Sequence, residues 1–299
     1  MHIPLVAPID AGALARVAFA PVFAVGFIAA ALVLLPAHGP WVLPALLVAA
    51  IASSLAAERL LPYQRIWNLS FGDARRDIAH ALVNEGSKVV GVLSVPLLGQ
   101  NLPWAGPWPT ALPLVIQLLI AVLVADIGVT LVHYASHRSR LLRRFHAVHH
   151  SVQRMYGFNG LLKHPLHQAL ETLAGTLPLL LLGIPIDVAW LLGFAVSIQL
   201  LLQHSNVDMQ LGFLSRVWAV APVHRLHHLG SAADGNVNFG LFTCFLDYAL
   251  GTARRNDARR VGPGMIGIED EPDFPTSYVA QLVEPFRKIR KPSKAKKSG

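Results

Sequence analysis

The chain has 299 residues, of which 54% are hydrophobic and only 14% are charged. Soluble domains carry roughly 25% charged residues, so the composition argues against a soluble protein. Lysines and arginines outnumber acidic residues by 25 to 17, and they gather between and after the long apolar segments. That distribution is typical of membrane proteins and not of proteins that bind nucleic acids. Cys244 is the single cysteine, which excludes an internal disulfide and a metal site built from cysteines alone.

Three apolar segments are clear candidates for membrane-spanning helices. Residues 17–35 and 41–57 are each about long enough to cross the hydrocarbon core as a helix, and a proline- and glycine-containing break separates them. Residues 111–132 form the third. Because a second span follows the first directly, we interpret residues 17–35 as a retained anchor and not as a cleaved signal peptide.

Two further apolar segments are ambiguous. Residues 78–98 contain Glu85 and Lys88, so they form either a span packed against its neighbours or a helix that lies partly in the interface. Residues 173–203 are apolar for too long to be one helix and are interrupted around Pro185. This pattern predicts a helical hairpin that dips into or crosses the bilayer.

Lysine and arginine are unevenly distributed among the connecting segments. They occur in residues 59–77, in residues 138–163 and after residue 251, whereas the turns at 36–40, 101–110 and 183–187 contain none. By the positive-inside rule, both termini and the histidine-rich segments face the cytoplasm, provided that residues 78–98 count as a span. We therefore expect a multi-pass protein of the bacterial inner membrane, or of the endoplasmic reticulum membrane if the chain is eukaryotic.

Histidine is the most unusual feature, because 11 of the 14 histidines lie between residues 133 and 228. Eight of them form one HxxxH motif and two HxxHH motifs. Helical positions three or four apart share a face, so each motif can aim two or three imidazoles at one point. His204 ends the predicted hairpin on the same side. The converging set is His133, His137, His146, His149, His150, His204, His224, His227 and His228.

This number of imidazoles predicts two metal ions, since a structural zinc site needs only four ligands. A dinuclear site above apolar helices suits a reaction on a lipid presented from the bilayer. Such a lipid has no good leaving group, so oxidation of an unactivated C–H bond is the expected chemistry. Zinc has no redox chemistry, and iron is therefore favoured.

Asp126 is the predicted catalytic-site carboxylate. It shares a helix face with His133 and His137, and a carboxylate within a span is a functional candidate. We expect it to accept a ring N–H from a ligand histidine, the alternative being a bond to a backbone amide or an arginine. His164 precedes Pro165 at a predicted helix start, and His167 follows one turn later. Both are candidate metal ligands; alternatively, His164 caps the helix and His167 is an ordinary residue on its face.

Ordered motifs between Asp126 and Thr252 resemble the fatty acid hydroxylase superfamily, also called the sterol desaturase family, of integral-membrane non-haem iron enzymes. The resemblance covers all the histidine motifs, the Lys163-His164-Pro165 segment, and a closing motif made of residues 238–240, Asp247 and residues 251–252. It implies that the nine converging histidines are ligands of a di-iron centre. One departure is Asp208, where some members carry a further histidine.

The resemblance further implies that dioxygen and two external electrons hydroxylate or desaturate a C–H bond of a lipid, with ether cleavage also known among members. Fatty acyl chains, sterol-like molecules, carotenoids and alkylglycerols remain open as substrates. No cytochrome b5 domain is fused within these residues, so a separate donor is expected: a cytochrome b5-like protein, a ferredoxin, or a rubredoxin with its reductase. The alternatives from other classes are a zinc-dependent lipid hydrolase and a metal transporter.

The expected fold is all-α, with roughly four to six transmembrane or re-entrant helices and a cytosolic helical cap that carries the histidine-rich dimetal site. Three parts are expected along the chain. Residues 1–110 form N-terminal transmembrane helices, residues 111–252 form the hydroxylase-like catalytic domain, and residues 253–299 form a polar, basic tail.

Overall fold

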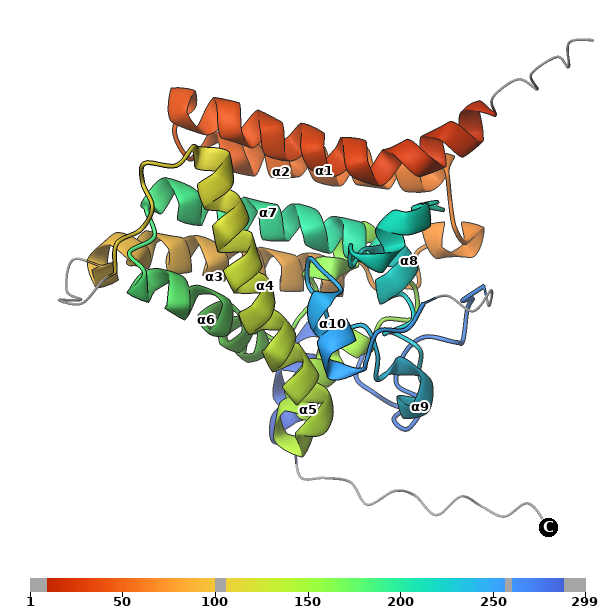
Figure 1. The fold of residues 1–299 in the computed structure, drawn as a ribbon. Coiled ribbons are helices and arrows are strands. Elements are labelled where there is room, and N and C mark those ends of the chain that lie inside the picture. Colours follow the sequence, from red (N-terminus) through yellow and green to blue (C-terminus); the bar gives the residue numbers. More distant parts are fainter. Residues whose placement is uncertain (1–9, 100–105, 256–259, 288–299) are drawn as a thin grey trace, which may run out of the picture.

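A computed structural model describes residues 10–99, 106–255 and 260–287. Within these residues all regular structure is helical, and β-pairing is limited to isolated bridges, as the predicted all-α fold requires. Six long helices form a bundle, and a short helix α5 with several smaller elements caps one end of it (Figure 1). The long helices are α1 (Ala11–His38), α2 (Val42–Leu60), α3 (Ala74–Gly99), α4 (Leu114–Arg138), α6 (Pro165–Leu181) and α7 (Ile186–His204).

The α1–α2 hairpin covers one side of the bundle. The Asp10 side chain caps α1 by accepting a hydrogen bond from the amide of Gly12, and Gly39 ends the helix with φ of 77°. Val22 and Val25 on α1 remain more than two-thirds exposed. An outward apolar face of this kind is expected where lipid replaces water as the solvent.

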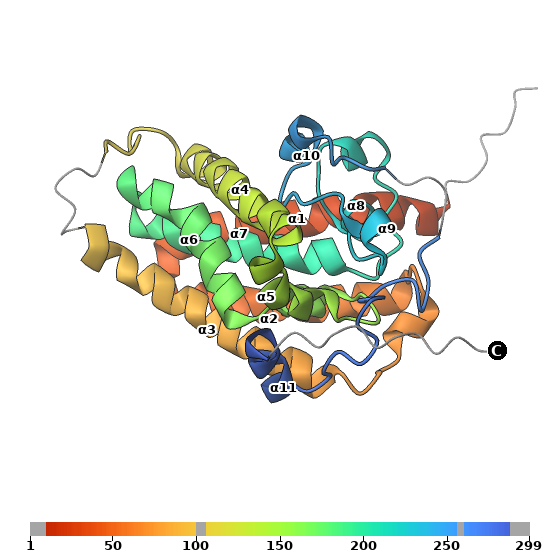
Figure 2. The same ribbon diagram turned by 90° about the horizontal axis from the view of Figure 1, so that it is seen from below.

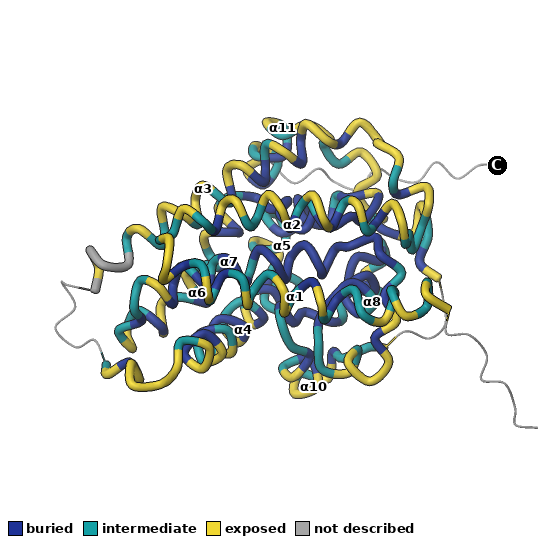
Figure 3. The backbone as a smooth tube through the Cα atoms, turned by 90° about the horizontal axis from the view of Figure 1, so that it is seen from above, coloured by how far each residue is buried: buried dark blue, intermediate teal, exposed yellow. Residues whose placement is uncertain are grey.

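Helix α7 is the central element. Most of its side chains are buried, and it packs against α1, α2, α3 and α4. In Figure 3 the tube of α7 is largely dark blue, whereas the outer helices show exposed turns. The turn between α6 and α7 contains Gly183 in the left-handed region at φ 75° and Pro185 as the cap of α7, so the predicted hairpin is confirmed.

Four helices are long and apolar enough to span a membrane: α1, α2, α4 and α7. This number lies within the predicted range. Helix α3 is continuous but is not among the four, and the mid-helix ion pair of Glu85 with Lys88 lowers its hydropathy. Even so, α3 packs against both α6 and α7, and the turns at 36–40 and 183–187 lie at one end of the bundle while the histidine-bearing segments lie at the other (Figure 1).

Small residues allow α4 and α6 to cross closely. A Cβ atom on Gly128 would lie 2.1 Å from the carbonyl oxygen of Ala174, and one on Gly175 would lie 3.3 Å from the carbonyl of Ala125. Close backbone approach at glycine is a common way to pack helices in membranes. The crossing fixes the last turns of α4, which carry His133 and His137, against the start of α6.

The cap combines α5 (Arg140–His150) with four short helices, α8 (Ala221–His224), α9 (Ala232–Gly235), α10 (Phe245–Leu250) and α11 (Tyr278–Val283), and with four 3-10 turns. The turns are η1 (Arg65–Asn68), η2 (Gly157–Leu161), η3 (Gly212–Arg216) and η4 (Glu284–Phe286). Seen from below in Figure 2, α11 lies beside α3, where the Gln281 side chain hydrogen-bonds to His80 (2.9 Å). The basic stretch from residue 288 lies outside the described residues, and the predicted division into three parts stays a prediction.

Candidate metal centre

The structure brings all nine histidines together from four segments of the cap and bundle. The segments are the last turns of α4, helix α5, the end of α7, and α8 with the turn that follows it. The side chains form two groups, and within each group the candidate ligand atoms lie within 4.8 Å of one another. The first group is His133, His137, His146, His150 and His227, and the second is His149, His204, His224 and His228.

In the first group, hydrogen bonds fix which ring nitrogen of His133 and of His227 is free. The Nδ1 atom of His133 donates to the carbonyl oxygen of Phe239 (2.8 Å), and that of His227 donates to the carbonyl of Val237 (2.9 Å). A carbonyl can only accept, so in each neutral ring the Nε2 atom carries a lone pair. These two Nε2 atoms lie 2.9 Å apart.

Two lone pairs at that distance repel each other unless a cation lies between or beside them. Both rings are buried, which makes protonation of either ring costly. A metal ion satisfies both atoms at once, and imidazole is a ligand for iron, copper, zinc and nickel. The donor set of the first group therefore fits a metal ion.

The second group repeats this arrangement with four imidazoles. His149 donates from Nδ1 to the carbonyl of Leu162 (2.9 Å), and Nε2 of His228 lies 3.1 Å from Nε2 of His204 and 3.2 Å from Nε2 of His224. Burial lowers the pKa of His149 and of His224 well below the usual value, with the neighbouring histidines adding to the effect. The rings are thus neutral at physiological pH, which is the form that binds metal.

One loop, residues 236–243, supplies the acceptors for three rings of the first group. The amide oxygen of Asn236 accepts from His137 (2.8 Å), and the carbonyls of Val237 and Phe239 accept from His227 and His133. Such partners set ring orientation at metal sites and raise the basicity of the ligands. We call residues 236–243 the acceptor loop.

Asp247 holds the acceptor loop in place. Its two carboxylate oxygens accept hydrogen bonds from the amides of Phe239 (2.7 Å) and Gly240 (2.9 Å), and Thr252 donates a third from its hydroxyl (2.7 Å). Gly240 is required, since a Cβ atom there would lie 2.0 Å from the carbonyl oxygen of Thr243. The closing motif of the sequence therefore acts on the histidines through the loop backbone.

The expected role of Asp126 is wrong. Its carboxylate accepts hydrogen bonds from the amides of Leu241 (3.1 Å), Phe242 (2.8 Å) and Thr243 (3.1 Å) and from the hydroxyl of Thr243 (2.6 Å), and it does not bond to a histidine ring. Backbone amides of the acceptor loop take up the carboxylate, and the Nδ1 atom of His133 instead donates to the carbonyl of Phe239 in the same loop. Asp126 is a positioning residue that ties the loop to α4.

Glu58 was missed by the sequence analysis. It lies buried in the last turn of α2, and one carboxylate oxygen accepts hydrogen bonds from the amides of Gly157 (2.6 Å) and Asn206 (3.1 Å). Asn206 follows His204 by two residues, so this contact fixes the end of α7 that carries the ligand. A glutamate directly after the predicted span at 41–57 was the available clue, but it resembles ordinary interfacial charge.

Two residues left open by the sequence lie outside both groups. The His164 ring accepts a hydrogen bond from the amide of Leu166 (3.1 Å), so His164 caps α6, as the following proline indicated. Asp208 pairs with Arg16 at 3.5 Å. Neither belongs to a cluster of candidate ligands among the described residues.

His167 belongs to a third, mixed group with His146 and Glu171. Its Nε2 atom lies 2.9 Å from the Ser136 hydroxyl, and Glu171 forms a buried ion pair with Lys163 at 2.5 Å. His146 is shared with the first five-histidine group. Through His146, the third group therefore links the first histidine group to His167 and Glu171 in the first half of α6.

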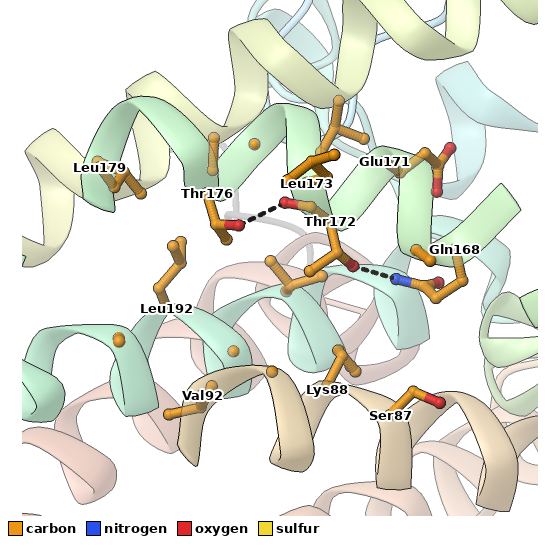
Figure 4. A pocket seen from close by; sticks show the side chains of 18 of the residues that line it. Ser87, Lys88, Val92, Gln168, Glu171, Thr172, Leu173, Thr176, Leu179 and Leu192 are labelled. Atoms are coloured by element: carbon orange, nitrogen blue, oxygen red, sulfur yellow. Dashed lines mark hydrogen bonds between the residues drawn. The ribbon is translucent and has the colours of Figure 1, made fainter. Parts of the chain in front are cut away.

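An apolar cavity of about 330 Å³ begins at this point and runs between α3, α4, α6 and α7. Lys163, Gln168 and Glu171 line one end, and leucine and isoleucine side chains line the other. Figure 4 shows the gradient along α6, from Glu171 and Gln168 to Leu179. The polar end is the end next to His146.

Comparison with known proteins gives two matches. A family model described as fatty acid hydroxylase matches residues 118–252. The ornithine lipid hydroxylase OlsE of Rhizobium tropici is 32% identical over 248 residues, which cover 78% of this chain and 72% of that protein. No solved structure gives a significant match.

Proposed function

Because the chain belongs to the fatty acid hydroxylase family, we propose that it is a membrane-bound lipid hydroxylase that holds two iron ions in its two histidine groups. The observation that carries this proposal is the pair of Nε2 atoms of His133 and His227, which lie 2.9 Å apart with both Nδ1 atoms committed to carbonyls. Iron bound there would supply the redox chemistry for inserting an oxygen atom from dioxygen into a C–H bond.

The residues around the histidines orient the ligands and exclude water. Carbonyl and amide oxygens of the acceptor loop fix three rings of the first group, and Asp126 and Asp247 fix the loop. Eight of the nine rings are buried, and His137 is partly exposed. A dry, rigid site suits oxidation of an unactivated bond, because it keeps reactive species away from solvent.

The cavity supports a binding mode for the lipid. Its apolar part accepts a hydrocarbon chain, and its polar end places Lys163 and Glu171 beside the metal groups. A lipid bound in this direction would lie with its polar portion near the metals and its chain end near Leu179. The oxidised carbon would then lie close to the polar portion of the lipid.

The relative named as an ornithine lipid hydroxylase makes ornithine-containing lipids the first substrates to test. Such a headgroup carries an amino group and a carboxylate, for which Glu171 and Lys163 are complementary partners. Hydroxylation is proposed in preference to desaturation or ether cleavage on the strength of that relative and of the family.

The distribution of Lys and Arg supports a cytoplasmic position for the metal groups. Two electrons per turnover would come from a separate carrier, and His137 is the partly exposed ring of the first group. The electron carrier classes to test are cytochrome b5-like proteins, ferredoxins and rubredoxins with their reductases.

The test combines three measurements on protein purified in detergent with iron supplied. Iron per chain, dioxygen uptake with a reductant system, and the mass of the lipid product are measured on ornithine lipid and on total lipid extract. We expect about two irons per chain and a product that is heavier by one oxygen atom. His133→Ala and His204→Ala, one from each group, should each lose iron and activity, whereas His38→Ala, an exposed histidine, should keep both.

The competing hypothesis is a zinc-dependent lipid hydrolase. Such an enzyme needs three protein ligands and an open position on its metal, so nine converging histidines exceed its needs. Tightly held zinc, no dioxygen uptake with any donor, and release of a lipid headgroup would favour the hydrolase and overturn our proposal.

A further inference from the structure

A second, smaller cavity of about 100 Å³ lies outside the metal centre and the lipid cavity. Tyr63, Asp208 and Arg225 line it together with apolar side chains. Tyr63 follows the end of α2, Asp208 follows the end of α7, and Arg16 of α1 contacts Asp208. The cavity is therefore at the level where three candidate spans begin or end, which is the depth of lipid headgroups.

The unusual group in this cavity is the guanidinium of Arg225. The side chain is 4% exposed, yet among the described residues it forms no ion pair with a carboxylate. One terminal nitrogen donates to the carbonyl of Ser205 (3.1 Å), the guanidinium carbon lies 3.7 Å from the centre of the Tyr63 ring, and the buried Nε atom has no partner. Burying a charge without a counter-charge is costly.

Asp208 attracts the charge of Arg225 but compensates it only in part. Asp208 is engaged by Arg16 at 3.5 Å, and a third guanidinium, that of Arg260, lies 4.5 Å from the centre of the same Tyr63 ring. The cavity and its surroundings thus hold three guanidinium groups and one carboxylate, that of Asp208. An anion bound in the cavity would balance this excess of positive charge.

We propose that this cavity is an oxyanion site that binds a phosphate group through Arg225. The fork of N–H donors in a guanidinium matches the oxygens of a phosphate, and arginine is the residue that most often recognises this geometry. The volume suits a single tetrahedral oxyanion and not a whole lipid. The phosphate belongs either to the headgroup of a phospholipid or to free inorganic phosphate, and the experiment separates the two sources.

The oxyanion site does not depend on the proposed hydroxylase activity. Arg225 lies between His224 and His227 in sequence, but its side chain points to Tyr63 and Ser205 and not to either histidine group. The test accordingly uses binding and not turnover.

The first experiment compares the melting temperature of detergent-purified protein in inorganic phosphate and in chloride at equal ionic strength. The second uses native mass spectrometry to compare the retention of phosphatidylglycerol with that of a phosphate-free galactolipid. We expect either a rise of at least about 2 °C in the melting temperature in 10 mM phosphate, or selective retention of phosphatidylglycerol. The first result identifies free phosphate as the source, and the second identifies the phospholipid headgroup.

Arg225→Gln should abolish the effect, whereas Arg216→Gln, which removes an exposed arginine, should leave it unchanged. If Arg225→Gln does not fold, Asp208→Asn decides: removing the one carboxylate that lines the cavity should tighten phosphate binding about fivefold. A wild-type protein that responds to neither ligand, an effect that survives in Arg225→Gln, or an unchanged affinity in Asp208→Asn overturns the proposal.

Discussion

The Nδ1 atom of His133 lies 2.8 Å from the carbonyl oxygen of Phe239, a residue 106 positions further along the chain, and the amide of Phe239 donates in turn to Asp247. A histidine at the end of a long membrane helix is thus oriented by a loop near the end of the matched family region. This relationship makes the acceptor loop part of the metal centre, although none of its residues belongs to the two histidine groups.

Asp247→Asn tests this dependence. The asparagine keeps the size of the side chain, but its NH2 group would face an amide donor of Phe239 or Gly240 in place of a carboxylate oxygen. We expect the loop to shift and the affinity for iron to fall about 10- to 100-fold, the usual effect of losing a residue that orients ligands. Iron per chain, measured after dialysis against a graded series of chelator concentrations, checks this.

Asp270→Asn is the matched control, because Asp270 is an exposed aspartate whose replacement changes the charge equally. Its iron content should equal that of the wild type. Normal iron affinity in Asp247→Asn would show that the loop does not control the histidines.

Gly240→Ala should disrupt the same loop by steric means. The new Cβ atom would meet the carbonyl oxygen of Thr243 at 2.0 Å, a backbone atom that cannot move without breaking the contacts of Asp126. Overpacking of this kind costs about 1–3 kcal/mol, so the melting temperature should fall by several degrees and iron should be lost with it. Gly26→Ala on α1, where nothing lies within 4 Å of the new Cβ, should be neutral or slightly stabilising. Equal melting temperatures of the two variants would contradict the steric argument.

Most of the frame follows from local sequence pattern. Apolar length and the break at Gly183 and Pro185 were sufficient to predict the spans and the α6–α7 hairpin, because these properties depend on neighbouring residues alone. The convergence of the nine histidines followed in the same way from i, i+3 and i+4 spacing together with a common side of the membrane.

Partners that are distant in sequence could not be predicted. Asp126 shares a helix face with His133, which suggested a direct contact, but whether a carboxylate bonds to a ring or to a backbone amide depends on where a loop 115 residues away lies. Glu58 and Asp247 act in the same way, through backbone amides, and amides carry no sequence signature. The oxyanion cavity also joins residues from four separate segments.

The Lys163–Glu171 ion pair gives a further test. Both side chains are at least nine-tenths buried, so Lys163→Met leaves a buried carboxylate uncompensated and should cost about 3–5 kcal/mol, and Glu171→Gln should cost a similar amount. The double variant removes both charges and should be much less destabilised than the sum of the single variants. Chemical unfolding of the four proteins measures the coupling. If the loss of stability in the double variant equals the sum of the losses in the two single variants, the two charges do not compensate each other.

Gly193→Phe tests whether the lipid chain occupies the cavity between α3, α4, α6 and α7. Gly193 lines the cavity on α7, about 16 Å along the helix from His204, and a Cβ atom there would touch only Val92, at 3.8 Å. The phenyl ring has room to enter the cavity and would block its apolar end. We expect kcat/KM for long-chain lipids to fall at least about tenfold, a loss of about 1.4 kcal/mol, while lipids with short chains are affected much less.

Gly26→Phe places the same ring on the exposed face of α1 and should change kcat/KM for neither class of lipid. If Gly193→Phe lowers kcat/KM equally for every chain length, the chain does not extend past Gly193 and lies elsewhere.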